Sequence, residues 1–255
     1  MADLMTGQTA LILGVANKWS LAYAIAQAFR REGAKLILTY QSERQKETVE
    51  ELGTELGAAA IFECDVTREE DLTKLTETVR GHGKLDVVVH SLAFANREDL
   101  SRPFLETSRA GFGLALDVSA YSLVSVARAT APLMTEGGSI LTLSYLGATR
   151  VAPNYNVMGV AKAALEASVR YLASELGATG IRVNAISAGP VKTTSARGVK
   201  DFSKMLEAVA SKSPLKRNCE PAEVADTAVF LASPLGRGVT GSVLFVDAGY
   251  SIMAL

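Results

Sequence analysis

The residues with the clearest capacity for chemistry are Tyr155 and Lys162, which stand seven positions apart. In a helix this spacing is about two turns, so both side chains would face one side, together with Met158 and Gly159. A phenol can donate a proton or a hydrogen bond, and an ammonium brings a positive charge beside it. Asn154 or a neighbouring residue is expected to cap this helix. Each residue alone would more simply be a surface side chain, but the pair after a predicted strand indicates a catalytic site.

A second group of residues marks a cofactor site. Gly14 ends the first predicted strand, and Ser20 precedes a helical pattern that begins with Leu21. A helix that starts at the edge of a sheet presents free N–H groups and the positive end of its dipole, which suit a pyrophosphate. The usual glycine-rich dinucleotide motif is incomplete, because Lys18 and Ser20 occupy two of its glycine positions. Gly14 alone would fit a structural turn equally well.

The ends of three further predicted strands support the dinucleotide interpretation. The residues at these ends are Gln41, Asp65, Val66, Ser91 and Leu92. In a doubly wound fold they meet the adenosine ribose, the adenine ring and the nicotinamide side, in that order along the chain. A neutral Gln41 at the ribose position favours NADH, although Arg44 lies close enough in sequence to contact the 2′-phosphate of NADPH.

These residues need a scaffold that brings strand ends together. Apolar runs alternate with amphipathic stretches, which is typical of parallel strands joined by crossover helices. One helix is expected over residues 20–32, with Gly33 as its C-cap. Strands buried on both faces are expected at residues 9–13, 35–40, 59–65, 86–92, 139–144, 182–187 and 243–247. Right-handed crossovers would then give an α/β fold, a Rossmann-like doubly wound parallel sheet of about seven strands in a single domain, residues 1–255.

Composition argues against several classes of function. Lys and Arg total 26 and Asp and Glu total 27, so the chain has no bulk positive field for binding a nucleic acid. The N-terminus lacks a signal-like pattern and no apolar run of about 18 residues occurs, so we expect no membrane partner and a cytoplasmic location. The cysteines and histidines are scattered along the sequence, and we expect no metal site.

Three longer segments resemble one known family. They are Ser-Tyr-Leu-Gly-Ala from residue 144, Pro-Asn-Tyr-Asn-Val-Met-Gly-Val-Ala-Lys from residue 153 and Arg-Val-Asn-Ala-Ile-Ser-Ala-Gly-Pro from residue 182. Together with the loop that starts at Gly14, they closely resemble the bacterial enoyl-acyl-carrier-protein reductases, members of the short-chain dehydrogenases/reductases. The similarity extends over essentially the whole chain.

The resemblance implies NADH-dependent reduction of the carbon–carbon double bond of an enoyl thioester in fatty acid biosynthesis. Hydride would reach C3, and negative charge would collect on the thioester oxygen as an enolate before C2 is protonated. It also implies that Tyr155 hydrogen-bonds that oxygen and that Lys162 binds the nicotinamide ribose. Tyr145 would either form a wall of the pocket or act directly. The expected substrate contacts are Ala95, Tyr145, Tyr155 and Met158.

Two further features follow from the same resemblance. A substrate-covering segment is implied near residues 191–210, in which Val191, Thr193 and Ser195 would lie beside the cofactor and Lys200 and Lys204 would attract an acidic acyl carrier protein. Residues 243–255 carry one charge in thirteen positions. Such an apolar tail favours burial between subunits, in line with the homotetramer that the resemblance suggests.

Two other functions fit the same fold. A carbonyl reductase acting on 3-oxoacyl thioesters would use Tyr-x-x-x-Lys with a serine further upstream, but Met158 and Tyr145 occupy those two positions. A non-catalytic dinucleotide-binding sensor would keep the cofactor loops without needing the Tyr155–Lys162 pair. Absorbance of NADH with a crotonyl thioester, with a 3-oxoacyl thioester and with no substrate separates the three functions.

Overall fold

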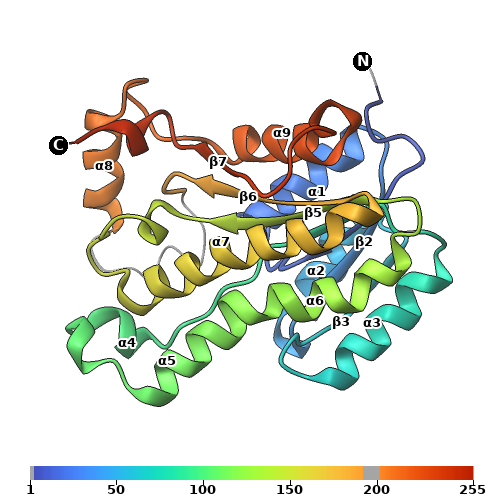
Figure 1. The fold of residues 1–255 in the computed structure, drawn as a ribbon, viewed down its shortest axis with the longest axis horizontal. Coiled ribbons are helices and arrows are strands. Elements are labelled where there is room, and N and C mark those ends of the chain that lie inside the picture. Colours follow the sequence, from blue (N-terminus) through green and yellow to red (C-terminus); the bar gives the residue numbers. More distant parts are fainter. Residues whose placement is uncertain (1–2, 192–201, 255) are drawn as a thin grey trace.

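A computed structural model describes residues 3–191 and 202–254, which form one central sheet with helices on both sides (Figure 1). The strands are β1 (Thr9–Leu13), β2 (Lys35–Tyr40), β3 (Ala60–Glu63), β4 (Val87–His90), β5 (Gly138–Ser144), β6 (Ile181–Ala188) and β7 (Val243–Val246). The α-helices are α1 (Leu21–Arg31), α2 (Glu43–Glu55), α3 (Glu69–Gly81), α4 (Arg97–Ser101), α5 (Arg109–Leu116), α6 (Ser122–Thr130), α7 (Asn156–Leu176), α8 (Phe202–Lys212) and α9 (Pro221–Ala232).

The sheet has seven strands in the order β3-β2-β1-β4-β5-β6-β7, and all neighbouring pairs are parallel. This confirms the predicted doubly wound sheet. The chain leaves β1 toward β2 on one side and later returns to place β4 on the other side. Ligands bind in folds of this kind at the carboxyl ends of the strands, beside that change of direction.

The predicted strands agree with the structure in position but not in every boundary. Residues 9–13 and 35–40 are matched fully, whereas β3 and β4 end two residues before their predicted ends at 65 and 92. Three of the residues that follow these strands, Cys64, Ser91 and Leu92, line a cavity instead of continuing the sheet. Burial on both faces was wrong for β3 and β7, which are edge strands and only partly buried, with Phe245 exposed.

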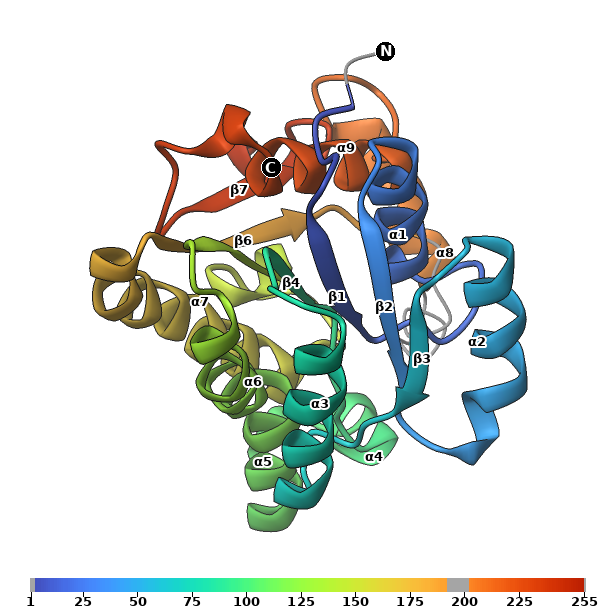
Figure 2. The ribbon, with the colours of Figure 1, turned by 90° about the vertical axis from the view of Figure 1, so that its right-hand side faces the viewer.

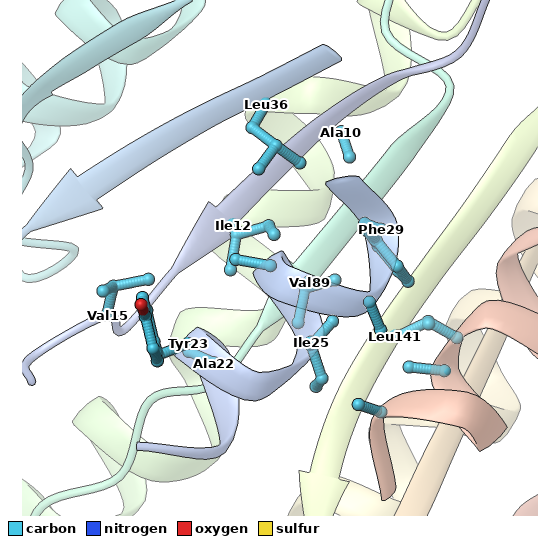
Figure 3. Close-up of a cluster of buried hydrophobic side chains, with 14 of the residues drawn as sticks. Ala10, Ile12, Val15, Ala22, Tyr23, Ile25, Phe29, Leu36, Val89 and Leu141 are labelled. Atoms are coloured by element: carbon cyan, nitrogen blue, oxygen red, sulfur yellow. The ribbon is translucent and has the colours of Figure 1, made fainter. Parts of the chain in front are cut away.

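Helices form a layer on each face of the sheet. Figure 2 shows α1 and α9 on one side of the strands and α3, α6 and α7 on the other. Two clusters of buried side chains fill the spaces between the helices and the sheet. In the first, Ile25 and Phe29 of α1 pack against Ile12, Val89 and Leu141 of the strands (Figure 3).

Helix α1 begins after its predicted N-cap, but its C-cap is Glu32 and not the predicted Gly33. Ser20 is the N-cap, and its hydroxyl oxygen accepts a hydrogen bond from the backbone N–H of Tyr23 at 3.3 Å. Gly33 follows the helix with φ +89°, a left-handed conformation that glycine adopts without steric cost. The free N–H groups at the start of α1 therefore lie at the carboxyl edge of the sheet, beside the end of β1.

Residues 109–133 form a helical stretch that could cross a membrane by length and composition alone. Its most apolar window is 56% buried inside the fold, and its helices pack on α3 and α7. The core helix of a globular protein has the same properties, so this stretch is weak evidence for a membrane span.

Candidate active site

One cavity of about 520 Å³ opens at the carboxyl ends of the strands, within the range of about 300–1,000 Å³ usual for small-ligand sites. It gathers most of the residues singled out from the sequence. Those that line it are Gly14, Ser20, Leu21, Gln41, Val66, Ser91, Leu92, Ala95, Tyr145, Tyr155, Met158, Lys162 and Val191. Thr193, Ser195 and Lys200 lie outside the described residues.

The cofactor end of the cavity depends on a close approach between two strand ends. Gly14 has φ +97°, and a Cβ atom there would lie 2.1 Å from the backbone oxygen of Ser91. The backbone N–H of Ser91 in turn donates to the carbonyl oxygen of Leu13 at 3.1 Å. Only glycine fits this position, because a Cβ atom would collide with the backbone of Ser91. A simple turn would not need this close approach.

Asp65 does not line the cavity, although its two neighbours in the sequence do. Its Oδ1 accepts hydrogen bonds from the backbone N–H and the hydroxyl of Thr67, at 3.0 and 2.7 Å. Partial burial acts to raise the pKa of this carboxyl, but the hydrogen bonds from Thr67 and Gln41 outweigh it and the pKa is lowered. Cys64 and Val66, on either side, line the cavity instead. A cofactor contact of Asp65 stays a prediction, as does a contact of Gln41 with the adenosine ribose, while Arg44 lies exposed on α2.

The backbone around Tyr155 is unusual. Asn154 has φ +61° and Asn156 has φ +41°, and both values fall in the left-handed region that non-glycine residues seldom adopt. Helix α7 starts at Asn156, with Tyr155 as N-cap and no side-chain cap hydrogen bond. The cap was predicted at Asn154 or a neighbouring residue, and the neighbour Tyr155 holds that position, although no side chain caps the helix. The two left-handed residues flank Tyr155, one before the helix and one at its first position.

Tyr155 is held between a glycine-lined surface and a second tyrosine. The rings of Tyr145 and Tyr155 meet edge to face, with centroids 4.9 Å apart and an interplanar angle of 63°. A Cβ on Gly147 would lie 2.4 Å from the Tyr155 ring. The Tyr145 hydroxyl donates to Sδ of Met205 at 3.5 Å. This contact and the ring packing give Tyr145 the position of a pocket wall.

Both phenols are neutral donors. Burial raises the pKa of Tyr145 to about 12 and raises the pKa of Tyr155 as well, with the neighbouring tyrosine adding to the effect on Tyr155. A neutral phenol in an apolar setting can donate a hydrogen bond to an oxygen that gains negative charge.

Lys162 of α7 lines the same cavity as Tyr155 and is 6% exposed. Its ammonium Nζ donates to the carbonyl oxygen of Leu143 at 2.8 Å. Burial lowers the pKa of Lys162 to about 8, and the negative charge of Glu166 partly offsets this. Glu166 is itself buried and accepts a hydrogen bond from the Ser144 hydroxyl at 2.5 Å.

His90 at the end of β4 is a structural residue. Its ring nitrogens lie 3.0 Å from the hydroxyl of Thr142 and 2.8 Å from the hydroxyl of Ser122. Complete burial, with the charge of Lys162 nearby, lowers the pKa of His90 to about 3. The ring is neutral at ordinary pH and is fully occupied by its two hydroxyl partners.

Several lining residues escaped the sequence analysis. Phe202 and Met205 fall inside the predicted covering segment, although no single feature marked them. Arg97 and Leu100 come from the short helix α4, and Val118 from a π-helical turn at Asp117–Tyr121. These three have no periodic or motif signal, because irregular segments place them. Within residues 3–191 and 202–254, no group of three His, Cys, Asp or Glu side chains is placed to hold a metal ion.

Comparison with known proteins identifies the family of this chain. Residues 14–251 match the family described as "Enoyl-(Acyl carrier protein) reductase". The NADH-dependent enoyl-acyl-carrier-protein reductases of Bacillus cereus and of a Nostoc species are 53% and 52% identical, each over 98% of this chain and 99% of the relative.

Solved structures agree closely in fold. A Bacillus cereus enoyl-acyl carrier protein reductase, solved with NADP+ and an indole naphthyridinone, has a TM-score of 0.98 at 53% identity and covers 100% of both chains. The enzyme of Anaplasma phagocytophilum, solved with NAD, has a TM-score of 0.97 at 46% identity, covering 100% of this chain and 98% of its own. This chain therefore belongs to the enoyl-(acyl carrier protein) reductase family.

Proposed function

We propose that this protein is an NADH-dependent enoyl-acyl-carrier-protein reductase of fatty acid biosynthesis, which reduces the double bond of a trans-2-enoyl thioester. The observation that carries this proposal is the pairing of a partly buried Tyr155 and a buried Lys162 on the same cavity as the dinucleotide-type strand ends. Met158 and Tyr145 occupy the positions that a carbonyl reductase of this fold would fill with its catalytic tyrosine and serine. Reduction of a carbon–carbon double bond is therefore favoured over carbonyl reduction.

The lining residues fit a dinucleotide. The start of α1, with Gly14 and Ser20 before it, would hold the pyrophosphate, and Gln41 would face the adenosine ribose. Ser91, Leu92 and Val191 would lie near the nicotinamide, and Lys162 would bind its ribose hydroxyls. When bound, NADH supplies the hydride that C3 of the substrate accepts. The neutral Gln41 supports NADH rather than NADPH.

The chain's own contribution is to stabilise negative charge. Tyr155 would donate its hydroxyl hydrogen bond to the thioester oxygen as the enolate forms, and the positive charge of the Lys162 ammonium would lower the energy of that negative charge. The apolar lining from Met158, Phe202 and Met205 would exclude water and hold the acyl chain. Tyr145 would fix the ring of Tyr155 by its edge-to-face contact.

Acyl carrier protein is the proposed carrier of the substrate. Helix α8 borders the cavity through Phe202 and Met205 and carries Lys204 and Lys212 against one acidic residue, Glu207. Basic residues at a rim assist encounter with an acidic partner. Raising the salt concentration is expected to lower kcat/KM for a carrier-protein thioester more than for a coenzyme A thioester. Salt screens the attraction between the basic residues of α8 and an acidic carrier protein.

A homotetramer in the cytoplasm is the proposed state of the enzyme. The free edge of the sheet at β7 exposes 45% of Phe245, and a shallow hollow beside it is lined by Phe230, Leu244 and Val246. Ile252, in the following turn, is 76% exposed. A second copy of the chain would cover this apolar surface. Sedimentation equilibrium tests the assembly, and a monomer at micromolar concentration would contradict it.

The proposed activity is tested by following NADH absorbance with a crotonyl thioester, with a 3-oxoacyl thioester and with no substrate. Oxidation with the first alone is the expected result. Oxidation with the 3-oxoacyl thioester would identify a carbonyl reductase. Binding of NADH without oxidation in any of the three mixtures would identify a dinucleotide-binding sensor.

A further inference from the structure

The side-chain amide of Asn156, next to Tyr155, makes contacts that the proposed chemistry does not use. Its Nδ2 lies 2.7 Å from the carbonyl oxygen of Arg102, 3.1 Å from that of Leu100 and 3.5 Å from that of Asp99. An amide nitrogen has two hydrogens, so the two shorter contacts are the effective hydrogen bonds. Asn156 is the first residue of α7, and its partners end the short helix α4.

Helix α4 has few other means of staying in place. It is five residues long, so the carbonyl groups at its C-terminus have no partners within the helix. Asn156 supplies a donor for two of these groups from another element. Figure 1 shows α4 and the start of α7 at the same end of the molecule, and the two helices are in contact.

The opposite side of α4 is fixed through Asp99. This side chain is 8% exposed, and its Oδ1 accepts a hydrogen bond from the backbone N–H of Ser108 at 3.2 Å. Its Oδ2 accepts from the amide of Asn96 at 3.3 Å, and Gly111 of α5 packs directly against the carboxylate. Segment 96–102 is thus joined to α5 on one side and to α7 on the other.

The same segment forms the outer wall of the cavity. Arg97 and Leu100 line it, and Tyr155 lines it from the start of α7. The amide of Asn156 therefore connects this wall to the start of α7, directly next to the candidate catalytic tyrosine. Its left-handed φ of +41° aims the side chain at α4 and leaves Tyr155 facing the cavity.

We infer that Asn156 is a positioning residue that sets the spacing between Tyr155 and the 96–102 wall, and through it the preference for acyl chain length. A short acyl chain would bind beside Tyr155, whereas a longer chain would extend along the wall at Leu100. Loosening the wall then weakens the binding of long chains and leaves short chains and NADH almost unaffected. This inference rests on the enoyl reductase activity proposed above.

Three substitutions separate the amide from the backbone geometry. Asn156→Gly keeps the left-handed φ but removes the amide. Asn156→Asp keeps the side-chain shape but replaces the donor with a carboxylate that repels the carbonyl groups. Asn156→Ala removes the amide and also disfavours the left-handed φ. We expect Asn156→Gly to lower kcat/KM for a trans-2-octenoyl thioester by about fivefold, mainly through KM, as the loss of one net hydrogen bond requires. The crotonyl value and the NADH dissociation constant should change less than twofold.

The other two substitutions extend this result. Asn156→Asp should cause a larger loss with the octenoyl thioester than Asn156→Gly. Asn156→Ala should also lower kcat with the crotonyl thioester, because the strained backbone would then displace Tyr155, and Asn156→Gly should restore that value.

The matched control is Asn184→Asp, which removes a side-chain amide that donates to the backbone oxygen of Val239 at 2.9 Å. Asn184 lies in β6 outside the cavity lining, so its substitution should lower Tm without changing the ratio of octenoyl to crotonyl kcat/KM. An unchanged ratio in all three Asn156 variants would overturn the inference, whatever happens to Tm. A wild-type chain that oxidises no NADH with either thioester would instead overturn the proposed function.

Discussion

The two ends of the cavity are held by different means. At the cofactor end, paired strands meet: the N–H of Ser91 bonds to Leu13, and Gly14 lies against the backbone of Ser91. At the substrate end, the short helix α4 is fixed by single side-chain contacts, those of Asn156 and Asp99 among them. Backbone pairing fixes the first end, and individual side chains fix the second.

This difference predicts how each end responds to substitution. A change at the cofactor end acts through the sheet and should alter NADH binding together with stability. A change at the substrate end acts on one contact and should alter selectivity or turnover while the fold persists. Tyr155 and Lys162 both line this cavity, and substitution of Tyr155 should lower turnover while NADH binding and stability change little.

The largest effect is expected from Tyr155→Phe. Removing the hydroxyl takes away one donor to the developing enolate, worth about 3–4 kcal/mol in comparable sites, so kcat should fall by about two to three orders of magnitude. NADH affinity should change little, because the ring and its packing remain. Steady-state rates and NADH fluorescence titration check this. Tyr171→Phe, on the exposed face of the same helix, is the control and should leave kcat unchanged.

Gly14→Ala should break the cofactor end. A methyl group 2.1 Å from the Ser91 oxygen, together with φ +97°, forces the strand ends apart, so NADH affinity should fall by about a hundredfold with a lower Tm. Gly7→Ala is the matched control, because Gly7 also has a positive φ, +79°, but open space around it. Equal loss of NADH affinity in both variants would show that strain alone, without the close approach, explains the result.

Sequence patterns predicted the cofactor end far better than the substrate end. The strands β1 and β2 were matched to the residue, because continuous apolar runs with clear turn residues define them. The position of Tyr155 and Lys162 on one cavity followed from helical spacing together with family resemblance. The contribution of α4 could not be predicted, because Arg97 and Leu100 reach the cavity only through the tertiary contacts of Asn156 and Asp99. No local pattern encodes such contacts.

Gly147→Ala should disturb the junction of the two ends. The added methyl would lie 2.4 Å from the Tyr155 ring, so the ring must turn away from its preferred rotamer. Such a displacement costs about 1 kcal/mol, which corresponds to a loss of kcat of about fivefold. NADH affinity should stay near the wild-type value. Gly113→Ala on α5, where nothing lies within 4 Å, is the control and should have full activity.

The smallest effect is a pH dependence of NADH binding at Lys162. Burial lowers the pKa of this lysine to about 8, so the ammonium predominates below that pH and the neutral amine above it. Hydrogen bonds from a charged donor are stronger by about 1 kcal/mol, and NADH affinity should therefore fall by about fivefold as the pH rises through about 8. Fluorescence titration between pH 6.5 and 9.5, a range set about 1.5 units to either side of that pKa, would measure the change.

The neighbouring carboxylate provides the test of this assignment. Since the negative charge of Glu166 raises the pKa of Lys162, Glu166→Gln should move the loss of affinity to lower pH. Lys162→Met should give weaker binding with no such pH dependence, because no proton is left to lose. If the transition keeps its midpoint in Glu166→Gln, the titrating group is not Lys162. The charge of the Lys162 ammonium would then not account for the pH dependence of NADH binding.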